Sequence, residues 1–233
     1  MFWESEQTYL DLHAARGNFS VDHYAANVIT TTIGGGLSMA AALFVATSYI
    51  KLDDVRAGGT TAEKILLYII MADFLSAFSS VLGVWFPSNK AGCKAEGFFI
   101  IFSTTASFFW TSCLVIHLFL ITINKVGVRY LMASFHVVSW GLPLILAFVA
   151  LGAGALGRAP SFPSKSKAKY ISLTTGGWCW IKNFQDKGTT IAWTLMTSKV
   201  WELASYLLIT VLCWLIFCLL RFRVRYRMSR LLI

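Results

Sequence analysis

Five apolar stretches occupy most of the chain, and each is long enough to cross a lipid bilayer. A hydrocarbon core of about 30 Å needs only about 20 residues of helix. Because backbone polar groups cannot stay unpaired in lipid, apolar segments of this length must be helices rather than strands. The sequence therefore predicts an all-α integral membrane protein, a helical bundle whose spans cover residues 25–50, 65–86, 97–124, 131–156 and 200–220.

The composition supports this class of protein. Of the 233 residues, 57% are hydrophobic and only 13% are charged, a balance that a soluble domain with an ordinary polar surface could not carry. The formal net charge of +9 comes from basic residues in short segments that flank the spans. Such charges are typical of membrane edges, so we expect membrane lipids as partners and no nucleic acid.

The odd number of spans places the two termini on opposite sides of the membrane. Residues 1–24 have neither a basic leader nor an apolar core, so we expect the first span itself to direct insertion. Lys and Arg residues are balanced between the two sides and give no orientation. The glycosylation sequon at Asn18 favours an extracellular N-terminal tail (1–24), a long outer loop (157–199) and a basic cytoplasmic tail (221–233).

The five cysteines fall into two groups. Cys113, Cys213 and Cys218 lie inside apolar spans, where small packing residues are common. Cys93 and Cys179 lie outside the spans on the same, oxidising side, where they are expected to pair. Their disulfide would close a loop of more than 80 residues, an effect of roughly 4 kcal/mol in the chain-entropy model.

Four segments resemble a known receptor family. They are Gly177–Ile181 in the outer loop, Phe135–Leu144 in the fourth span, Ser107–Thr111 in the third and Lys199–Glu202 at the start of the fifth. Together they are similar to orphan G-protein-coupled receptors of the cyclic-AMP-receptor-like and secretin-like classes. The resemblance implies a seven-helix receptor fold, an unknown extracellular ligand, a heterotrimeric G protein as partner and a plasma-membrane location.

Two departures from the receptor pattern stand out. The third span ends Thr122-Ile123-Asn124-Lys125, without the Asp-Arg-Tyr triplet of rhodopsin-like receptors. The chain also ends after five of the seven expected helices. We therefore expect a truncated form with impaired signalling and retention in the endoplasmic reticulum, or a non-signalling partner that pairs with the full-length receptor.

Two ionisable residues inside the spans are candidates for an intramembrane polar contact, because a charge at the bilayer centre rarely persists without a partner. Counting residues from the inner ends of the second and third spans places Asp73 and His117 at similar depths in the membrane. Three interpretations stay open: a structural hydrogen bond between them, a conformational switch, or unrelated orientations. His117 with Cys113 alone is a poor metal site, so we expect no metal.

Aromatic and charged residues gather on the outer side, around the loop and the start of the fifth span. Tryptophan prefers the membrane interface, so simple anchoring explains each ring taken singly. A disulfide at Cys179 would nevertheless place these groups at the border of an outer cavity. The candidate ligand contacts are Trp178, Trp180, Lys199, Trp201 and Glu202.

Basic residues mark the inner side. On a strand the alternating arginines of the tail would share one face, whereas on a helix they would spread around the cylinder and meet lipid headgroups. Lipid anchoring is the first interpretation and contact with a G protein the second. The residues concerned are Lys51, Arg56, Lys125, Arg129, Arg221, Arg223, Arg225 and Arg227.

Two other functions fit less well. A transporter would show inverted repeats and broken helices near the midplane, and Pro143 is the only proline inside a span. An enzyme would need a converging nucleophile and base, which Asp73 and two separated histidines do not supply. The sequence therefore predicts a receptor with no catalytic residues and no cofactor.

Overall fold

The computed structural model describes residues 21–51, 60–85, 90–123, 128–158, 179–182, 184 and 186–231. Within these ranges the protein is nearly all helical, and five helical segments are long and apolar enough to span a membrane. The all-α, five-span prediction is confirmed. The first three spans are α2 (Val21–Lys51), α4 (Thr61–Trp85) and α5 (Lys90–Thr122).

The fourth and fifth spans are each built from two α-helices joined by a π-helical segment. The fourth comprises α6 (Val128–His136), η1 (Val137–Gly141) and α7 (Leu142–Gly152). The fifth comprises α8 (Lys187–Thr194), η3 (Leu195–Lys199) and α9 (Val200–Leu231). A two-stranded antiparallel hairpin, β1 (Leu156–Arg158) and β2 (Cys179–Ile181), lies between them in the chain.

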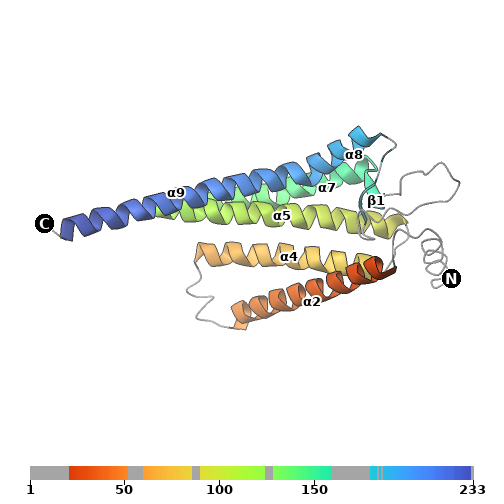
Figure 1. Ribbon diagram of the computed structural model, residues 1–233, viewed down its shortest axis with the longest axis horizontal. Coiled ribbons are helices and arrows are strands. Elements are labelled where there is room, and N and C mark those ends of the chain that lie inside the picture. The colour runs from red at the N-terminus through yellow and green to blue at the C-terminus, as the bar shows by residue number, and fades with distance from the viewer. Residues whose placement is uncertain are drawn as a thin grey trace.

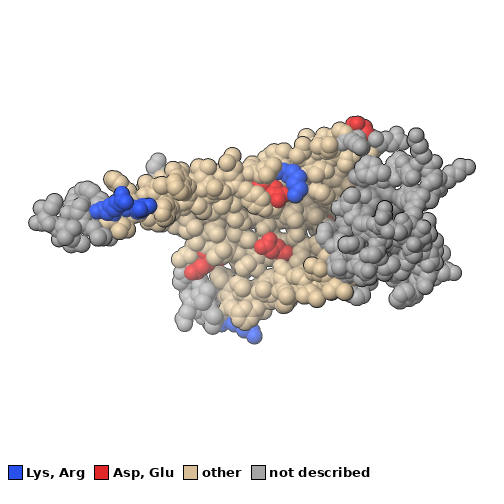
Figure 2. Space-filling model, in the orientation of Figure 1, with Lys and Arg blue, Asp and Glu red and all other residues tan. Residues whose placement is uncertain are grey.

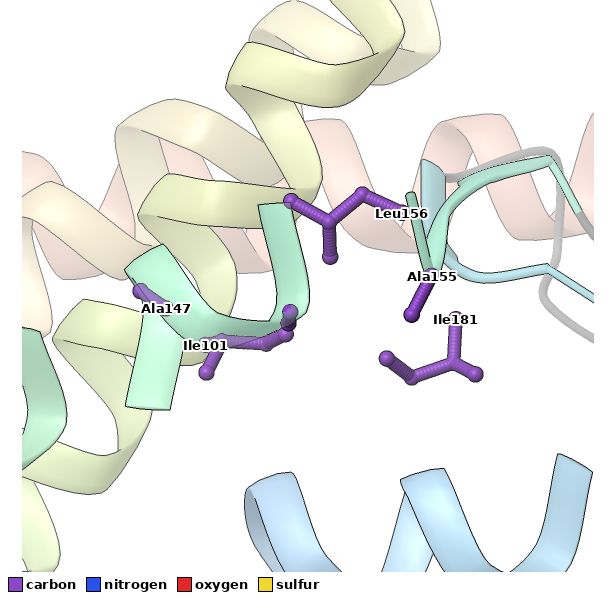
Figure 3. Close-up of a cluster of buried hydrophobic side chains, with 6 residues drawn as sticks. Ile101, Ala147, Ala155, Leu156 and Ile181 are labelled. Carbon is purple, nitrogen blue, oxygen red and sulfur yellow. The ribbon is translucent and has the colours of Figure 1, made fainter. Parts of the chain in front are cut away.

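Helix α5 is the centre of the bundle. It packs against α4 on one side and against α7 and α9 on the other, while α2 packs on α4 (Figure 1). One cluster of buried side chains joins α5 and α7 to the hairpin; it consists of Ile101, Ala147, Ala150, Ala155, Leu156 and Ile181 (Figure 3). A second cluster joins α4, α5 and α6 around Ile65, Trp110, Cys113 and Phe135.

The outer surface of the helices is strongly apolar. Phe44 on α2 is 72% exposed and Leu207 on α9 is 68% exposed, and many other large apolar side chains accompany them. A water-soluble monomer rarely exposes contiguous apolar surface on this scale. Exposed apolar surface on this scale is typical of helices embedded in a membrane.

Helix α7 turns into the hairpin through a Schellman motif. The amide of Ala155 donates to the carbonyl of Ala150 and the amide of Gly154 donates to that of Leu151. Gly154 has a φ of 62°, in the left-handed region that costs a glycine little. This reversal brings β1 back over the end of α5, where it pairs with β2.

The fifth helix is much longer than the predicted span 200–220. It begins at Lys187, inside the predicted outer loop 157–199, because Asp186 caps α8 by accepting from the amides of Gly188 and Thr189. It continues to Leu231, so the arginine-rich segment is helical through that residue. The third helix likewise begins at Lys90 rather than at residue 97.

The π-helical segment η1 lies just before Pro143, the second residue of α7. Proline has no amide hydrogen, and its ring clashes with the carbonyl four residues earlier, here that of Ser139. Widening the helix to a π turn accommodates this defect. Ser139 is fully buried within η1, and its Oγ lies 3.4 Å from Sγ of Cys113 on α5.

Candidate functional site

A disulfide ties the hairpin to the start of α5. Cys93 and Cys179 are bonded, with their Cα atoms 5.2 Å apart and 86 residues between them in sequence. The predicted bridge is confirmed. It holds β2 against the first turns of α5, and we call this the hairpin end of the bundle.

Glu96 strengthens the same junction and was not predicted. Its Oε1 accepts a hydrogen bond of 3.2 Å from the amide of Cys179, and the residue is buried. A Cβ atom at Gly83 of α4 would overlap the Glu96 carboxylate. Glu96 is the only acidic residue of the span Ala91–Thr122, which is the signal that could have identified it.

Gly97 makes a second close approach at the hairpin end. A Cβ atom there would lie 3.3 Å from the carbonyl oxygen of Trp180 and 3.4 Å from that of Cys179. The absence of a side chain lets the backbone of β2 lie directly on α5. The hairpin is therefore held by a covalent bond, a buried carboxylate and a glycine contact.

Asp73 contacts Ser107, not His117. Ser107 Oγ donates a hydrogen bond of 2.6 Å to Asp73 Oδ1. His117 lies ten residues further along α5, a distance of about 15 Å at 1.5 Å per residue, and is out of reach. The predicted Asp73–His117 hydrogen bond is wrong, because it assumed that the inner ends of the two spans lie level. His117 is buried, and its Nδ1 has no partner among the described residues.

Two contacts fix the level of Lys199 along the bundle. Thr105 Oγ1 donates to the carbonyl of Thr197 at 3.4 Å, and the rings of Phe109 and Trp201 meet with centroids 5.7 Å apart. In both pairs the residue numbers differ by 92, so residues of α5 and of the fifth helix that differ by 92 lie at the same level along the bundle. By interpolation Lys199 is level with Ser107.

Lys199 and Glu202 form an ion pair. Lys199 Nζ lies 2.7 Å from Glu202 Oε2, and the two side chains are 49% and 21% exposed. Four residues after Glu202, the ring of Tyr206 meets that of Phe108 on α5 with centroids 5.8 Å apart. Phe108 follows Ser107 directly, so Asp73 and the ion pair lie on either side of one turn of α5.

These contacts define a layer of polar and aromatic side chains across the bundle, here called the mid-bundle layer; its members are Asp73, Ser107, Phe108, Lys199, Glu202 and Tyr206. Ser107 is 16 residues from Ala91 and 15 from Thr122, the ends of its candidate span. Its hydrogen bond to Asp73 brings α4 to the same level. Figure 2 shows acidic and basic groups near the middle of an otherwise largely uncharged face. On α4 and α5 the layer therefore lies at the middle of the candidate spans, whereas Lys199 is 11 residues from Gly188 and 26 from Arg225, the ends of the candidate span of the fifth helix.

The segment η3 borders the mid-bundle layer. In its π turn the amide of Val200 donates to the carbonyl of Leu195, five residues earlier. The carbonyl of Met196 accepts a hydrogen bond of 2.8 Å from Nε1 of Trp201. Trp201 therefore stabilises the irregular backbone next to Lys199, in addition to its contact with Phe109.

The structure brings together three of the five predicted ligand contacts: Lys199, Trp201 and Glu202. Trp180 lies in β2, where its carbonyl contacts Gly97. Gly97 is ten residues from Ser107, so Trp180 is about 15 Å from the layer along the bundle. Trp178 and the sequon residue Asn18 lie outside the described residues.

The opposite end of the bundle, here called the arginine end, is marked by exposed arginines on α9: Arg221, Arg223 and Arg225. This part of α9 extends beyond the other helices (Figure 1). Successive arginines are two residues apart, about 200° around a helix, so the cations spread around the cylinder. Lys51 is exposed at the end of α2, and the backbones of Arg129 and Arg227 belong to α6 and α9. Arg56 and Lys125 lie outside the described residues.

An aromatic cluster between α4, α5 and α6 was also missed. His136 packs edge-on against Tyr68 and Trp110, with ring centroids 4.7 and 4.9 Å apart. Trp110 is completely buried, and its Nε1 has no partner among the described residues. The three rings come from three different helices and pack against one another. A sequence pattern within one span could not predict such a contact.

Comparison with known proteins identifies the family of this helical arrangement. Residues 24–229 match the family described as 7 transmembrane receptor (Secretin family). The chain is 34% identical over 156 residues to the human G-protein coupled receptor 157, covering 65% of this chain and 43% of that protein. It is 31% identical over 190 residues to the rat G-protein coupled receptor 157, covering 79% and 50% respectively.

A more distant relative is the cyclic AMP receptor-like protein A of Dictyostelium discoideum. It is 24% identical over 148 residues, which cover 63% of this chain and 34% of that protein. The chain spans half or less of the length of these curated relatives. The family match covers nearly all of the helical bundle. The chain belongs to the secretin family of seven-transmembrane receptors.

Proposed function

We propose that this chain takes part in detecting an extracellular ligand and passing the signal to a heterotrimeric G protein. Membership of the secretin family of receptors supports this function. The observation that carries it is the mid-bundle layer, in which an ion pair and a further carboxylate lie on membrane-spanning helices, away from the helix ends. Ionisable groups in such positions are costly and mark binding sites or signalling elements.

The proposed orientation places the hairpin end outside the cell and the arginine end in the cytosol. The sequon at Asn18 and the disulfide support it, because glycosylation and stable disulfides belong to the extracellular side. A ligand would enter beside the hairpin, and the arginines would face the anionic inner leaflet and the G protein. The proposed location of the receptor is the plasma membrane.

Helix α9 is the element proposed to carry the signal. It runs without interruption from the mid-bundle layer to Arg221, which lies about 33 Å from Lys199 along the helix axis. A ligand shifts a conformational equilibrium only by interacting differently with the two states. Contact with Lys199, Trp201 or Glu202 would act directly on η3, and a change there would move the arginine end of α9.

The test is association with a G protein in living cells. Resonance energy transfer between the C-terminus of the chain and Gα subunits should exceed that of an unrelated membrane protein and should fall when GTP is supplied to permeabilised cells. Replacing Arg221, Arg223 and Arg225 by glutamine should abolish the signal. The control Lys94→Gln removes an exposed charge at the hairpin end and should leave it unchanged.

Absence of energy transfer with every Gα class would contradict the proposal, provided that surface labelling shows the chain at the plasma membrane. Loss of the signal in Lys94→Gln as well would show that the arginine end is not the specific contact.

A further inference from the structure

Two buried polar atoms on α5 have no hydrogen-bond partner. Trp110 is completely buried and His117 is only 3% exposed. Neither Nε1 of Trp110 nor Nδ1 of His117 is bonded to any group in the part of the chain that the structure describes. The large majority of buried side-chain polar atoms in proteins are hydrogen-bonded, so two such atoms on one helix require an explanation.

Both atoms belong to the same side of α5. Trp110 and His117 are seven residues apart, and Cys113 lies between them, three residues after the first and four before the second. Residues at these spacings share one side of a helix. Ile65 of α4 and Phe135 of α6 pack with Trp110 and Cys113 in a buried cluster. This side of α5 therefore faces the inside of the bundle.

Ser139 of η1 lies opposite the middle of this side. It is completely buried, and its Oγ is 3.4 Å from Sγ of Cys113. A thiol is a weak hydrogen-bonding group, whereas a hydroxyl can donate one bond and accept two. Ser139 therefore keeps most of its hydrogen-bonding capacity after its contact with Cys113.

The spacing of the three polar groups suits bridging by single molecules of water. Since Ser139 is level with Cys113, it lies about 4.5 Å from the level of Trp110 and about 6 Å from that of His117 along the axis of α5. Two successive hydrogen bonds of about 2.8 Å span at most about 5.6 Å. Each gap is therefore close to the span of one bridging water.

The chemistry of the three groups also selects water. The indole of Trp110 only donates, the hydroxyl of Ser139 donates and accepts, and Nδ1 of His117 does one or the other according to its tautomer. A cation could not accept from the indole, and an apolar molecule would leave every group unpaired. Water both donates and accepts, so it can bond to all three.

We propose that at least two water molecules are bound between α5 and η1, one bridging Trp110 to Ser139 and one bridging Ser139 to His117. Buried waters typically make about three hydrogen bonds to polar groups that would otherwise be unpaired. These waters join the third span to the π-helical segment of the fourth, where the direct polar contact is a weak thiol–hydroxyl pair. The site is independent of the proposed ligand and of G-protein coupling.

The test is radiolytic labelling of the whole chain in micelles. A short X-ray pulse converts water to hydroxyl radicals, which oxidise a buried side chain only where water lies beside it. Oxidised peptides are quantified by mass spectrometry and corrected for the intrinsic reactivity of each residue type. The variants are Ser139→Ala, His117→Phe and the control Ser103→Ala, which removes an equally buried hydroxyl that donates to the carbonyl of Phe99 within α5.

In the wild type, Trp110 and Cys113 should be oxidised several-fold faster than Ile101, a completely buried apolar residue of α5. Ser139→Ala should lower the oxidation of Trp110 several-fold, and His117→Phe should lower that of Cys113. Ser103→Ala should change neither. Misfolding cannot mimic these results, because unfolding raises the oxidation of every buried side chain.

Oxidation of Trp110 no faster than that of Ile101 would show that no water lies beside the indole and would overturn the proposal. Unchanged oxidation of Trp110 in Ser139→Ala would assign the labelling to bulk solvent and would also overturn it. Unchanged oxidation of Cys113 in His117→Phe would exclude the second bridge.

Discussion

Ser107 Oγ donates a hydrogen bond of 2.6 Å to Asp73 Oδ1, although the two residues are 34 positions apart. The bond joins the middle of α4 to the middle of α5, the central helix of the bundle. It fixes how far the two helices are shifted along each other, and through α5 it sets the level of Asp73 relative to Lys199. The mid-bundle layer depends on this polar contact between α4 and α5.

Ser107→Ala should weaken the packing of α4 on α5. It removes the hydroxyl donor and leaves the Asp73 carboxylate without its partner, so we expect a loss of about 1 kcal/mol in unfolding free energy. The measurement is unfolding in mixed micelles. The control is Ser80→Ala, whose Oγ donates only to the carbonyl of Ser76 within its own helix. Equal losses in the two variants would show that the bond between helices contributes nothing.

Gly83→Ala should disturb the hairpin end by displacing Glu96. The new Cβ overlaps the Glu96 carboxylate, which must move and then cannot accept from the amide of Cys179. Gly83→Ala and Glu96→Ala should therefore be strongly non-additive in a double-mutant cycle on thermal stability, because both remove the same bond. Gly36→Ala is the control, since nothing lies within 4 Å of the position that its Cβ would occupy. Additive losses would place the effect of Gly83 elsewhere.

Trp201→Phe should loosen η3 while keeping an aromatic ring against Phe109. It removes the indole hydrogen bond to the Met196 carbonyl, at a cost of about 1 kcal/mol. Hydrogen exchange of the amides of residues 195–200 should accelerate. Trp214→Phe changes an exposed ring on the same helix and should have little effect. Unchanged exchange in Trp201→Phe would mean that η3 is stable without the indole bond.

The cap at the start of α8 should depend on pH. Hydrogen bonds from the Thr189 side chain, the Thr189 amide and the Gly188 amide lower the pKa of Asp186 from its ordinary value of 3.8. A lowered pKa stabilises the folded cap above the ordinary value, and this contribution is lost as pH falls through the folded-state value. The protection of the first amides of α8 against hydrogen exchange should decline in that window. It should not decline in Asp186→Asn, which caps without titrating.

The five spans could be predicted because lipid imposes one solution, an apolar helix of sufficient length. The disulfide could be predicted because Cys93 and Cys179 were the two cysteines outside the spans. The first inference depends only on the residues within each span. The second depends only on which side of the membrane the two cysteines lie. Neither requires the relative heights of the helices.

The partner of Asp73 could not be predicted for that reason. Hydropathy locates a helix end to within several residues, and three residues already correspond to about 4.5 Å along the axis. Counting from uncertain ends made His117 level with Asp73, whereas the structure pairs Asp73 with Ser107. The same uncertainty hid Glu96, which lay one residue outside the predicted third span.

The π-helical segments η1 and η3 could not be predicted from the sequence either. Pro143 lies next to η1, but η3 contains no proline and is contacted by the indole of Trp201 and by the hydroxyl of Thr105 from another helix. The contact between η3 and Thr105 is tertiary, and a pattern along one helix does not contain it.

The most direct test of this account is the depth of the mid-bundle layer in a bilayer. Spin labels at Met71→Cys and Leu203→Cys, next to Asp73 and Glu202 and both exposed, would be compared with one at Val224→Cys, with Cys113, Cys213 and Cys218 replaced by serine. We expect the first two labels to be relaxed strongly by oxygen and shielded from a water-soluble nickel complex, and the third to be accessible to nickel. Nickel accessibility at Met71 and Leu203 equal to that at Val224 would place the layer near a membrane surface and contradict the account.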